Sequence, residues 1–233
     1  MKRLLIIGIL VLISNPLFSQ SDGAWFVLNN KNIDLVQKWE SFGINEERIN
    51  AIKNEAYANP NFINGNIYQE DQLIKADVSM RYNAYADEIE IKKYASDENY
   101  GALTKDPSIF VKLGLDVYVF APYEGSNEKG GYFNVLSDGK KYDLYKKITT
   151  FFVEPRIAKT SYERDIPPSF SKKVKYYLVQ NGTFLEMPSS KSKVLKMMAA
   201  KKDEVKNYII QNDIDLNTER DLVKLVSYFD SLL

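Results

Sequence analysis

The stretch VKYYLVQNGTFLEM, residues 174–187, decides the fold class. Two runs rich in β-branched and aromatic residues flank the dipeptide Asn181-Gly182. Asn and Gly tolerate the positive φ angles that a type I′ turn requires, so the two runs are expected to pair as an antiparallel hairpin. The segment therefore predicts a sheet in which strands that are neighbours in the sequence lie side by side.

A hydrophobic period of two continues upstream of this hairpin. Val78, Met80 and Tyr82 alternate with polar residues, and so do Ile89 and Ile91. This alternation is typical of antiparallel strands with one apolar and one polar face. Further strands are predicted at 116–123, 132–136 and 141–153. Together these segments predict about seven or eight strands.

After residue 188 the hydrophobic period becomes helical. Val194, Leu195 and Met198 follow a Ser-Ser start, and Leu222 and Leu225 belong to a later helix of the same kind. Amphipathic helices need an apolar surface to cover, and the sheet is the nearest one. Near the N-terminus, two short stretches have helical spacing, one at Ile33, Val36 and Trp39 and the other at Ile49, Ile52 and Ala56.

The expected fold is α+β, with a mostly antiparallel curved sheet, built as a sandwich or an open barrel, and a C-terminal helical element. Residues 20–60 form an N-terminal segment with short helices, 61–187 form the β domain, and 188–233 form helices that pack on the sheet. No internal repeat or low-complexity linker divides the chain.

The first nineteen residues have the pattern of a Sec-type signal peptide. The basic pair Lys2-Arg3 precedes an apolar run at 4–13, and the small residue Ser19 precedes Gln20. A membrane-spanning helix needs about 20 apolar residues, and this run is about half as long. We expect cleavage near Gln20 and a protein that is secreted or periplasmic. No later stretch reaches spanning length.

Composition excludes several classes of chemistry. The chain has 31 basic and 31 acidic residues, no His and no Cys. The absence of His and Cys excludes Ser-His-Asp triads, Cys-His pairs, His-ligated zinc and lipid attachment at Cys. Loss of Lys2 and Arg3 with the signal leaves a slightly acidic protein, and we expect no nucleic-acid partner and no cofactor.

Three motifs resemble functional sites but lack essential residues. The acidic stretch 213–221 resembles a calcium loop, but Thr218 replaces the turn glycine and Lys224 replaces the bidentate Glu. The glycine-rich segment 125–131 lacks the lysine of a phosphate loop. Glu88 and Glu90 share one side of a strand and resemble a glycosidase pair. The alternation with Ile89 and Ile91 favours a polar sheet face instead.

Aromatic residues are abundant, with 16 Tyr and 12 Phe. Six tyrosines fall on predicted strands, and an exposed row of them can stack on sugars or hold a peptide. The first five are our candidate ligand contacts: Tyr82, Tyr85, Tyr118, Tyr132 and Tyr142, followed in the chain by Tyr145. The alternative, which strand preference favours, is that these rings fill the core.

Lysines cluster at the start of the C-terminal helical region. Lys191, Lys193 and Lys196 lie beside Val194 and Leu195 in a stretch without acids. This arrangement is typical of a basic amphipathic helix that contacts an anionic membrane or a partner. The alternative is a packed helix with a solvated lysine face, which the frequency of such helices favours.

The chain also resembles a group of known proteins. Segments 62–65, 80–90, 131–136 and 201–232, together with the signal ending Leu-Phe-Ser-Gln, are similar to uncharacterised secreted or cell-envelope proteins of Bacteroidota. The resemblance implies an envelope setting and gives no activity or site residue. We therefore expect a non-catalytic envelope protein that binds a partner protein, glycan or lipid. The alternatives are a carboxylate-dependent polysaccharide hydrolase and a structural subunit of an envelope assembly.

Overall fold

The computed structural model describes residues 26–27 and 46–233, except 124, 125 and 161. Within this part of the chain, eleven strands form one sheet in the order β1-β5-β4-β3-β2-β6-β7-β8-β9-β10-β11. Every neighbouring pair is antiparallel. The strands are β1 (Phe26–Val27), β2 (Ile63–Gln69), β3 (Gln72–Asn83), β4 (Glu88–Ile91), β5 (Gly101–Leu103), β6 (Ile109–Leu113), β7 (Asp116–Tyr123), β8 (Ser126–Ser137), β9 (Asp143–Val153), β10 (Ser169–Gln180) and β11 (Thr183–Glu186).

The α+β class and the mostly antiparallel, curved sheet are confirmed. The sheet has four strands that the sequence pattern did not predict, β1, β2, β5 and β6. β1 and β5 have only two and three residues, which is too few to show a period. The register of β2 against β3 shifts after Gly65 and after Ile67, which interrupts the alternation there. The hairpin at Asn181-Gly182 is present, with both residues at positive φ.

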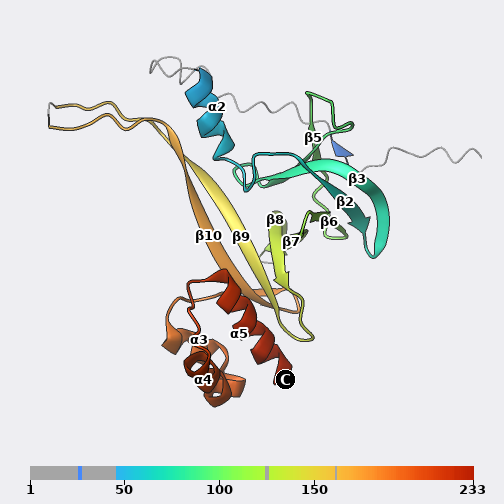
Figure 1. Cartoon of the computed structure of the whole chain (residues 1–233), viewed down its shortest axis with the longest axis vertical. Coiled ribbons are helices and arrows are strands. Elements are labelled where there is room, and N and C mark those ends of the chain that lie inside the picture. The colour runs from blue at the N-terminus through green and yellow to red at the C-terminus, as the bar shows by residue number, and fades with distance from the viewer. Residues whose placement is uncertain (1–25, 28–45, 124–125, 161) are drawn as a thin grey trace, which may run out of the picture.

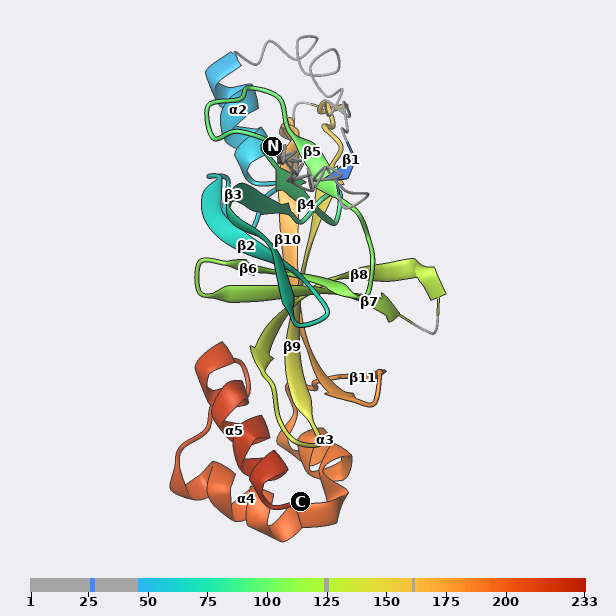
Figure 2. The same cartoon turned by 90° about the vertical axis from the view of Figure 1, so that its right-hand side faces the viewer.

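The sheet is curved so strongly that the turn between β3 and β4 contacts β9. The amide of Thr150 donates to the carbonyl of Ala84 over 3.1 Å, and the Tyr82 hydroxyl donates to the carbonyl of Ile148 over 3.1 Å. Nearby, Lys147 Nζ lies 2.6 Å from Asp87 Oδ1. These contacts fold the sheet over its own apolar face without completing a barrel (Figure 2).

The concave side of the curved sheet holds the larger core. Its buried side chains come from β2 to β8: Ile67, Val78, Met80, Tyr82, Ala84, Ile89, Ile91, Leu103, Ile109, Val111, Leu113, Tyr118, Phe120 and Tyr132. Ile89 belongs to this core, whereas Glu90 points to the opposite face of β4 and is buried there. Strand β4 is therefore buried on both faces, and the expected polar face at Glu90 is absent.

Glu90 belongs to a buried polar cluster, which we call the Arg81 cluster. Its carboxylate accepts hydrogen bonds from Arg81 Nε at 2.7 Å, Asn83 Nδ2 at 2.7 Å and the Tyr57 hydroxyl at 3.4 Å. The Arg81 guanidinium lies 3.8 Å from the centroid of the Tyr57 ring and 4.2 Å from that of Phe62. Through Tyr57 and Pro60, this cluster binds the segment that follows α2 (Glu46–Asn54) to β3 and β4.

The C-terminal helices form a second core at the other end of the molecule (Figure 1). They are α3 (Lys191–Met197), the 3₁₀ turn η1 (Ala199–Lys201), α4 (Lys202–Gln211) and α5 (Glu219–Ser231). Leu222, Leu225 and Phe229 of α5 are buried together with Leu144 of β9 and Leu178 of β10. The helices thus cover the distal part of the β9–β10 ribbon, while the concave core is closed by the sheet itself.

Two expected features lie outside the described residues: the signal peptide at 1–19 and the helix with Ile33, Val36 and Trp39. The second expected N-terminal helix corresponds to α2. Over the residues that the structure describes, no helix has both the length and the hydropathy needed to cross a membrane.

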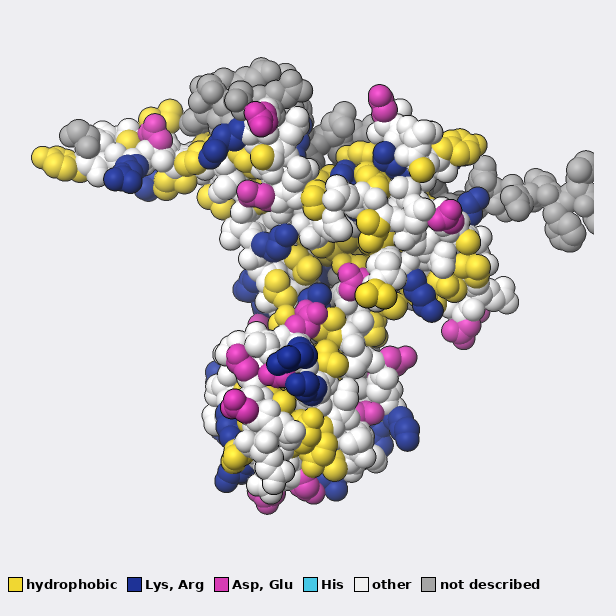
Figure 3. Space-filling model, in the orientation of Figure 1, with side chains coloured by type: hydrophobic (Ala, Val, Ile, Leu, Met, Phe, Trp, Pro, Cys, Tyr) yellow, Lys and Arg dark blue, Asp and Glu magenta, His cyan; other side chains and the backbone are white. Residues whose placement is uncertain are grey.

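A long arm connects β9 to β10. This ribbon arm, residues 154–168, extends away from the body of the molecule (Figure 1) and is held together by the bridge between Arg156 and Ile166. Ile157 and Tyr162 expose 63% and 98% of their surface. Apolar and basic side chains both show along the arm in Figure 3. The arm has no core of its own.

Candidate functional site

Three of the five candidate tyrosines are core residues. Tyr82, Tyr118 and Tyr132 are buried, and the Tyr82 ring packs against the other two. Burial raises the pKa of Tyr118 to about 12 and raises the pKa values of Tyr82 and Tyr132 as well. Strand preference placed these rings inside the curve of the sheet, where they cannot meet a ligand at the surface.

The other two candidates lie far apart. Tyr85 is exposed at the β3–β4 turn and packs edge-on against Phe170 of β10. Tyr142 directly precedes β9, and its ring centroid lies 5.1 Å from that of Phe229 in α5. The five tyrosines therefore form no continuous row.

The lysines of α3 are exposed, as both interpretations of the sequence require. Lys191, Lys193 and Lys196 face solvent, while Val194 and Leu195 are buried in the helical core. The apolar face of α3 is thus already covered by the protein, which leaves it no apolar surface to insert into a membrane.

In the acidic stretch 213–221, which resembles a calcium loop, the carboxylates of Asp215 and Asp221 accept hydrogen bonds from within the protein. Asp221 accepts from Lys224 Nζ at 2.9 Å and from the amide of Asp215 at 3.3 Å. Asp215 accepts from the amide and side chain of Asn217. Over the described ranges, no three acidic groups gather closely enough to hold a metal ion.

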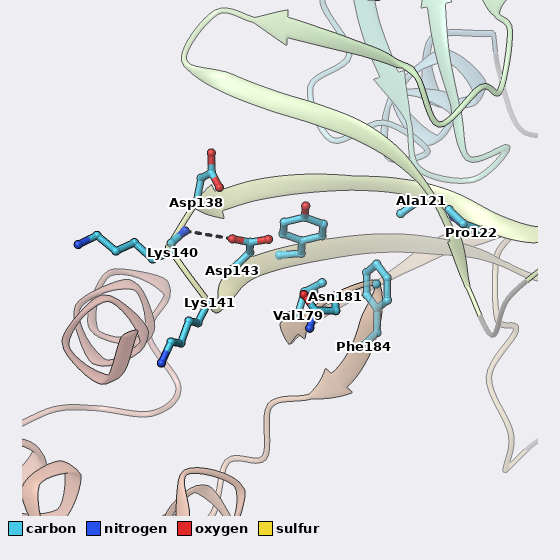
Figure 4. Close-up of a pocket in the computed structure, with 12 residues that line it drawn as sticks. Ala121, Pro122, Asp138, Lys140, Lys141, Asp143, Val179, Asn181 and Phe184 are labelled. Carbon is cyan, nitrogen blue, oxygen red and sulfur yellow. Dashed lines mark hydrogen bonds between the residues drawn. The ribbon is translucent and has the colours of Figure 1, made fainter. Parts of the chain in front are cut away.

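One open groove combines aromatic and polar side chains, and we call it the turn groove (Figure 4). Its volume is about 390 Å³. It lies between the end of β7, the β8–β9 turn and the β10–β11 turn. Its lining residues are Ala121, Pro122, Asp138, Gly139, Lys140, Lys141, Asp143, Tyr145, Val179, Asn181, Gly182 and Phe184.

The wall of the turn groove is aromatic. The ring centroids of Tyr145 and Phe184 lie 5.8 Å apart in an edge-to-face arrangement. Phe133 packs against both rings, and Tyr177 packs edge-on against Phe184. Burial, followed by the charges of Asp143 and Asp138, raises the pKa of Tyr145 to about 12. The wall is a rigid surface whose phenol stays protonated at neutral pH.

The other end of the groove is polar. Asp143 Oδ1 accepts a hydrogen bond from the amide of Gly139 at 3.0 Å (Figure 4). Burial, with the neighbouring carboxylate of Asp138, raises the pKa of Asp143. The exposed residues Asp138 and Lys140 add an acceptor and a donor at this end, whereas the exposed Asn181 lies beside Phe184 (Figure 4).

Helix α5 fixes the β8–β9 turn in place. Asp230 accepts three backbone hydrogen bonds, from the amides of Lys140 at 2.8 Å, Lys141 at 2.8 Å and Tyr142 at 2.9 Å. Burial opposes ionisation of this carboxyl, but the three amides outweigh it and hold the pKa of Asp230 below its usual value. The polar end of the groove is therefore positioned by a residue about ninety positions further along the chain.

A smaller hollow of about 210 Å³ surrounds Asp87 and Lys147. Burial lowers the pKa of Lys147, although Asp87 opposes this. The ammonium is already bound by Asp87 and by the carbonyl of Tyr132 at 2.9 Å. A Cβ on Gly131 would lie 2.4 Å from both Asp87 Oδ2 and Lys147 Nζ. Gly131 therefore leaves the space that the ion pair of Asp87 with Lys147 occupies. This ion pair joins the β3–β4 turn to the β8–β9 hairpin.

The sequence indicated the turn groove only in part. The sequence predicts that Tyr145 lies on a strand and that Asn181-Gly182 forms a hairpin turn. Phe184 and Asp143 were missed as site residues. Their positions follow from the register, since Leu144 pairs with Leu178 and Val179 with Phe184 across β9, β10 and β11. Comparison with protein-family models, with curated proteins and with solved structures gives no match.

Replacement of Asp143 by Asn is expected to stabilise the protein at pH 8. The raised pKa means that the folded state penalises the ionised carboxyl. The penalty is complete above the folded pKa and disappears as the pH falls below the unfolded value of about 3.9. Thermal melts from pH 8 to pH 4 should show a gain that shrinks with falling pH. Asp71→Asn, at an exposed turn, is the control, and a variant that is less stable at pH 8 would contradict the assignment.

Proposed function

We propose that the protein is an exported, non-catalytic cell-envelope protein that binds a neutral glycan in the turn groove. The observation that carries the proposal is the aromatic wall of Tyr145 and Phe184 beside the hydrogen-bonding groups of Asp138, Asp143 and Asn181. The signal-peptide pattern at 1–19 and the resemblance to envelope proteins support the setting.

A sugar ring matches this combination of surfaces. Its C–H face is apolar and packs on an aromatic ring, while its hydroxyl groups donate to carboxylates and accept from amides. The groove is open, so a sugar within a longer chain can enter from the side. Asp138 and Asp143 are balanced by Lys140 and Lys141 around the groove, which favours a neutral ligand over a strongly charged one.

Hydrolysis of the glycan is less well supported. Glycosidases hold two carboxyl groups about 5–9 Å apart on either side of the bond that is cleaved. Asp138 and Asp143 instead lie at the same end of the groove, where the charge of Asp138 contributes to the raised pKa of Asp143. Glu90, the other acid considered from the sequence, is bound to Arg81 in the interior. We therefore propose binding without turnover.

The proposal is tested with Phe184→Leu. This change keeps an apolar side chain but removes the ring, and it should weaken binding about tenfold, since a ring contact of this kind contributes about 1.4 kcal/mol. The mature protein is first screened against an array of neutral oligosaccharides, and the best ligand is then titrated by calorimetry.

Phe151→Leu is the matched control, because Phe151 is exposed on β9 away from the groove. It should bind as the unaltered protein does, and both variants should retain its melting temperature within a few degrees. Equal affinity for both variants, or an array without any bound oligosaccharide, would overturn the proposal.

A further inference from the structure

We infer that the outer edge of β10 binds an extended, acidic segment of a partner protein as an additional β-strand. This site lies outside the turn groove and does not depend on the glycan proposal. We call residues 170–176 of β10 the open edge. In Figure 1, β10 is the outer strand of the ribbon that it forms with β9.

The direction of the backbone groups follows from three contacts. The amide of Phe170 donates to Glu55 Oε2 at 3.3 Å, and the carbonyl of Tyr176 accepts from the amide of Met187 at 2.8 Å. Gln180 pairs with Thr183 across the β10–β11 turn. Because backbone groups alternate along a strand, the even-numbered residues of β10 direct theirs away from β9.

Two residues of the open edge direct backbone groups away from β9 that no other described strand pairs with. Strand β11 has four residues and pairs only with Tyr177–Gln180 of the twelve-residue β10. Among the backbone hydrogen bonds of the described residues, none beyond the β9 ladder involves Lys172 or Val174. Their N–H and C=O groups thus form a short template for an incoming strand.

The charge of the open edge selects the incoming strand. The chain has no acidic residue between Asp165 and Glu186, but it has Lys172, Lys173 and Lys175 in this interval. Lysines on an edge strand discourage pairing with a second copy, because the like charges would face one another. Lys172 Nζ donates to the carbonyl of Tyr57 and Lys175 pairs with Glu186, so the exposed Lys173 is the main group that attracts a strand with acidic side chains.

Exposed apolar side chains beside the open edge can contact the alternate residues of such a strand. Val174 exposes 44% of its surface. It pairs with Ile148 and therefore lies on the opposite face of the ribbon from Phe151, which pairs with Ser171. Ile157, Tyr162 and Ile166 continue the apolar surface along the ribbon arm. An acidic strand with apolar residues at alternating positions can therefore pair with the open edge while its apolar residues lie on the face of Val174 and its acidic residues lie on the face of Lys173.

The test uses a capped synthetic peptide of about eight residues in which Glu alternates with Val or Thr. Fluorescence anisotropy should show binding by the full mature protein that weakens with salt. A peptide of the same charge with two central prolines cannot form the ladder and should bind at least about tenfold more weakly. On binding, the amides of Lys172 and Val174 should become protected from hydrogen exchange.

Val174→Pro removes one outward N–H that has no backbone partner within the described part of the chain, so the fold should persist. This variant should also lose at least about tenfold in affinity for the acidic peptide. Lys173→Glu should weaken binding while preserving the melting temperature. Three results would each overturn the inference: no binding, equal binding of the proline-containing peptide, or protection of other amides only. The hydrogen-exchange measurement uses the unaltered protein, so it tests the inference even if Val174→Pro fails to fold.

Discussion

Replacement of Arg81 by Leu is expected to destabilise the fold by about 3–5 kcal/mol, since it leaves a buried carboxylate without its partner. Glu90 is 4% exposed and has Arg81 Nε at 2.7 Å. The guanidinium also donates to the carbonyl of Pro60 and to the Tyr57 hydroxyl, both at 2.8 Å. The measurement is urea denaturation at neutral pH, followed by circular dichroism.

Two variants isolate the cause of this loss. Arg220→Leu removes an arginine whose side chain is 81% exposed, and it should cost less than about 0.5 kcal/mol. Combining Arg81→Leu with Glu90→Gln removes the unpaired charge and should recover part of the stability. A loss below about 1 kcal/mol for Arg81→Leu would contradict the view that the Arg81 cluster holds the N-terminal part of the sheet.

Replacement of Leu225 by Ala is expected to destabilise the protein by about 2–5 kcal/mol, because a fully buried side chain is lost and a cavity remains. Leu225 is 0% exposed and lies in the core that α5 shares with β9 and β10. If the helices and the ribbon unfold together, the denaturation curve should shift as one transition with an unchanged slope.

Ile210→Ala is the control for this change, because Ile210 exposes 59% of its surface on α4. It should cost less than about 0.5 kcal/mol. A second transition in the Leu225→Ala curve would indicate that the helical core unfolds separately. A loss as small as that of the control would contradict the packing of α5 on the ribbon.

The fold could be predicted from the sequence wherever apolar residues recur with a strand or helix period over several residues. The hairpin at Asn181-Gly182 and the helix with Leu222 and Leu225 are local patterns, and the structure contains both. The path of the sheet could not be predicted in this way. Its curvature depends on contacts such as Thr150 with Ala84, which join residues far apart in the sequence and leave no periodic signal.

The candidate site was harder to predict than the fold. The sequence identified aromatic residues on strands, but the period alone cannot tell which side of a curved sheet faces solvent. Tyr82, Tyr118 and Tyr132 fill the concave core, whereas Tyr145 lines the turn groove. Phe184 reaches the groove because β11 pairs with β10 and β10 pairs with β9, which places Val179 between Phe184 and Asp143.

The glycan site can be tested most directly by a heteronuclear NMR titration of the mature protein with the oligosaccharide selected on the array. The account predicts saturable shift changes at Tyr145, Asn181 and Phe184 and at the β8–β9 turn, with the signals of α3 and the open edge unchanged. Shift changes confined to other surfaces, or none at saturating sugar, would contradict the assignment of the turn groove as the binding site.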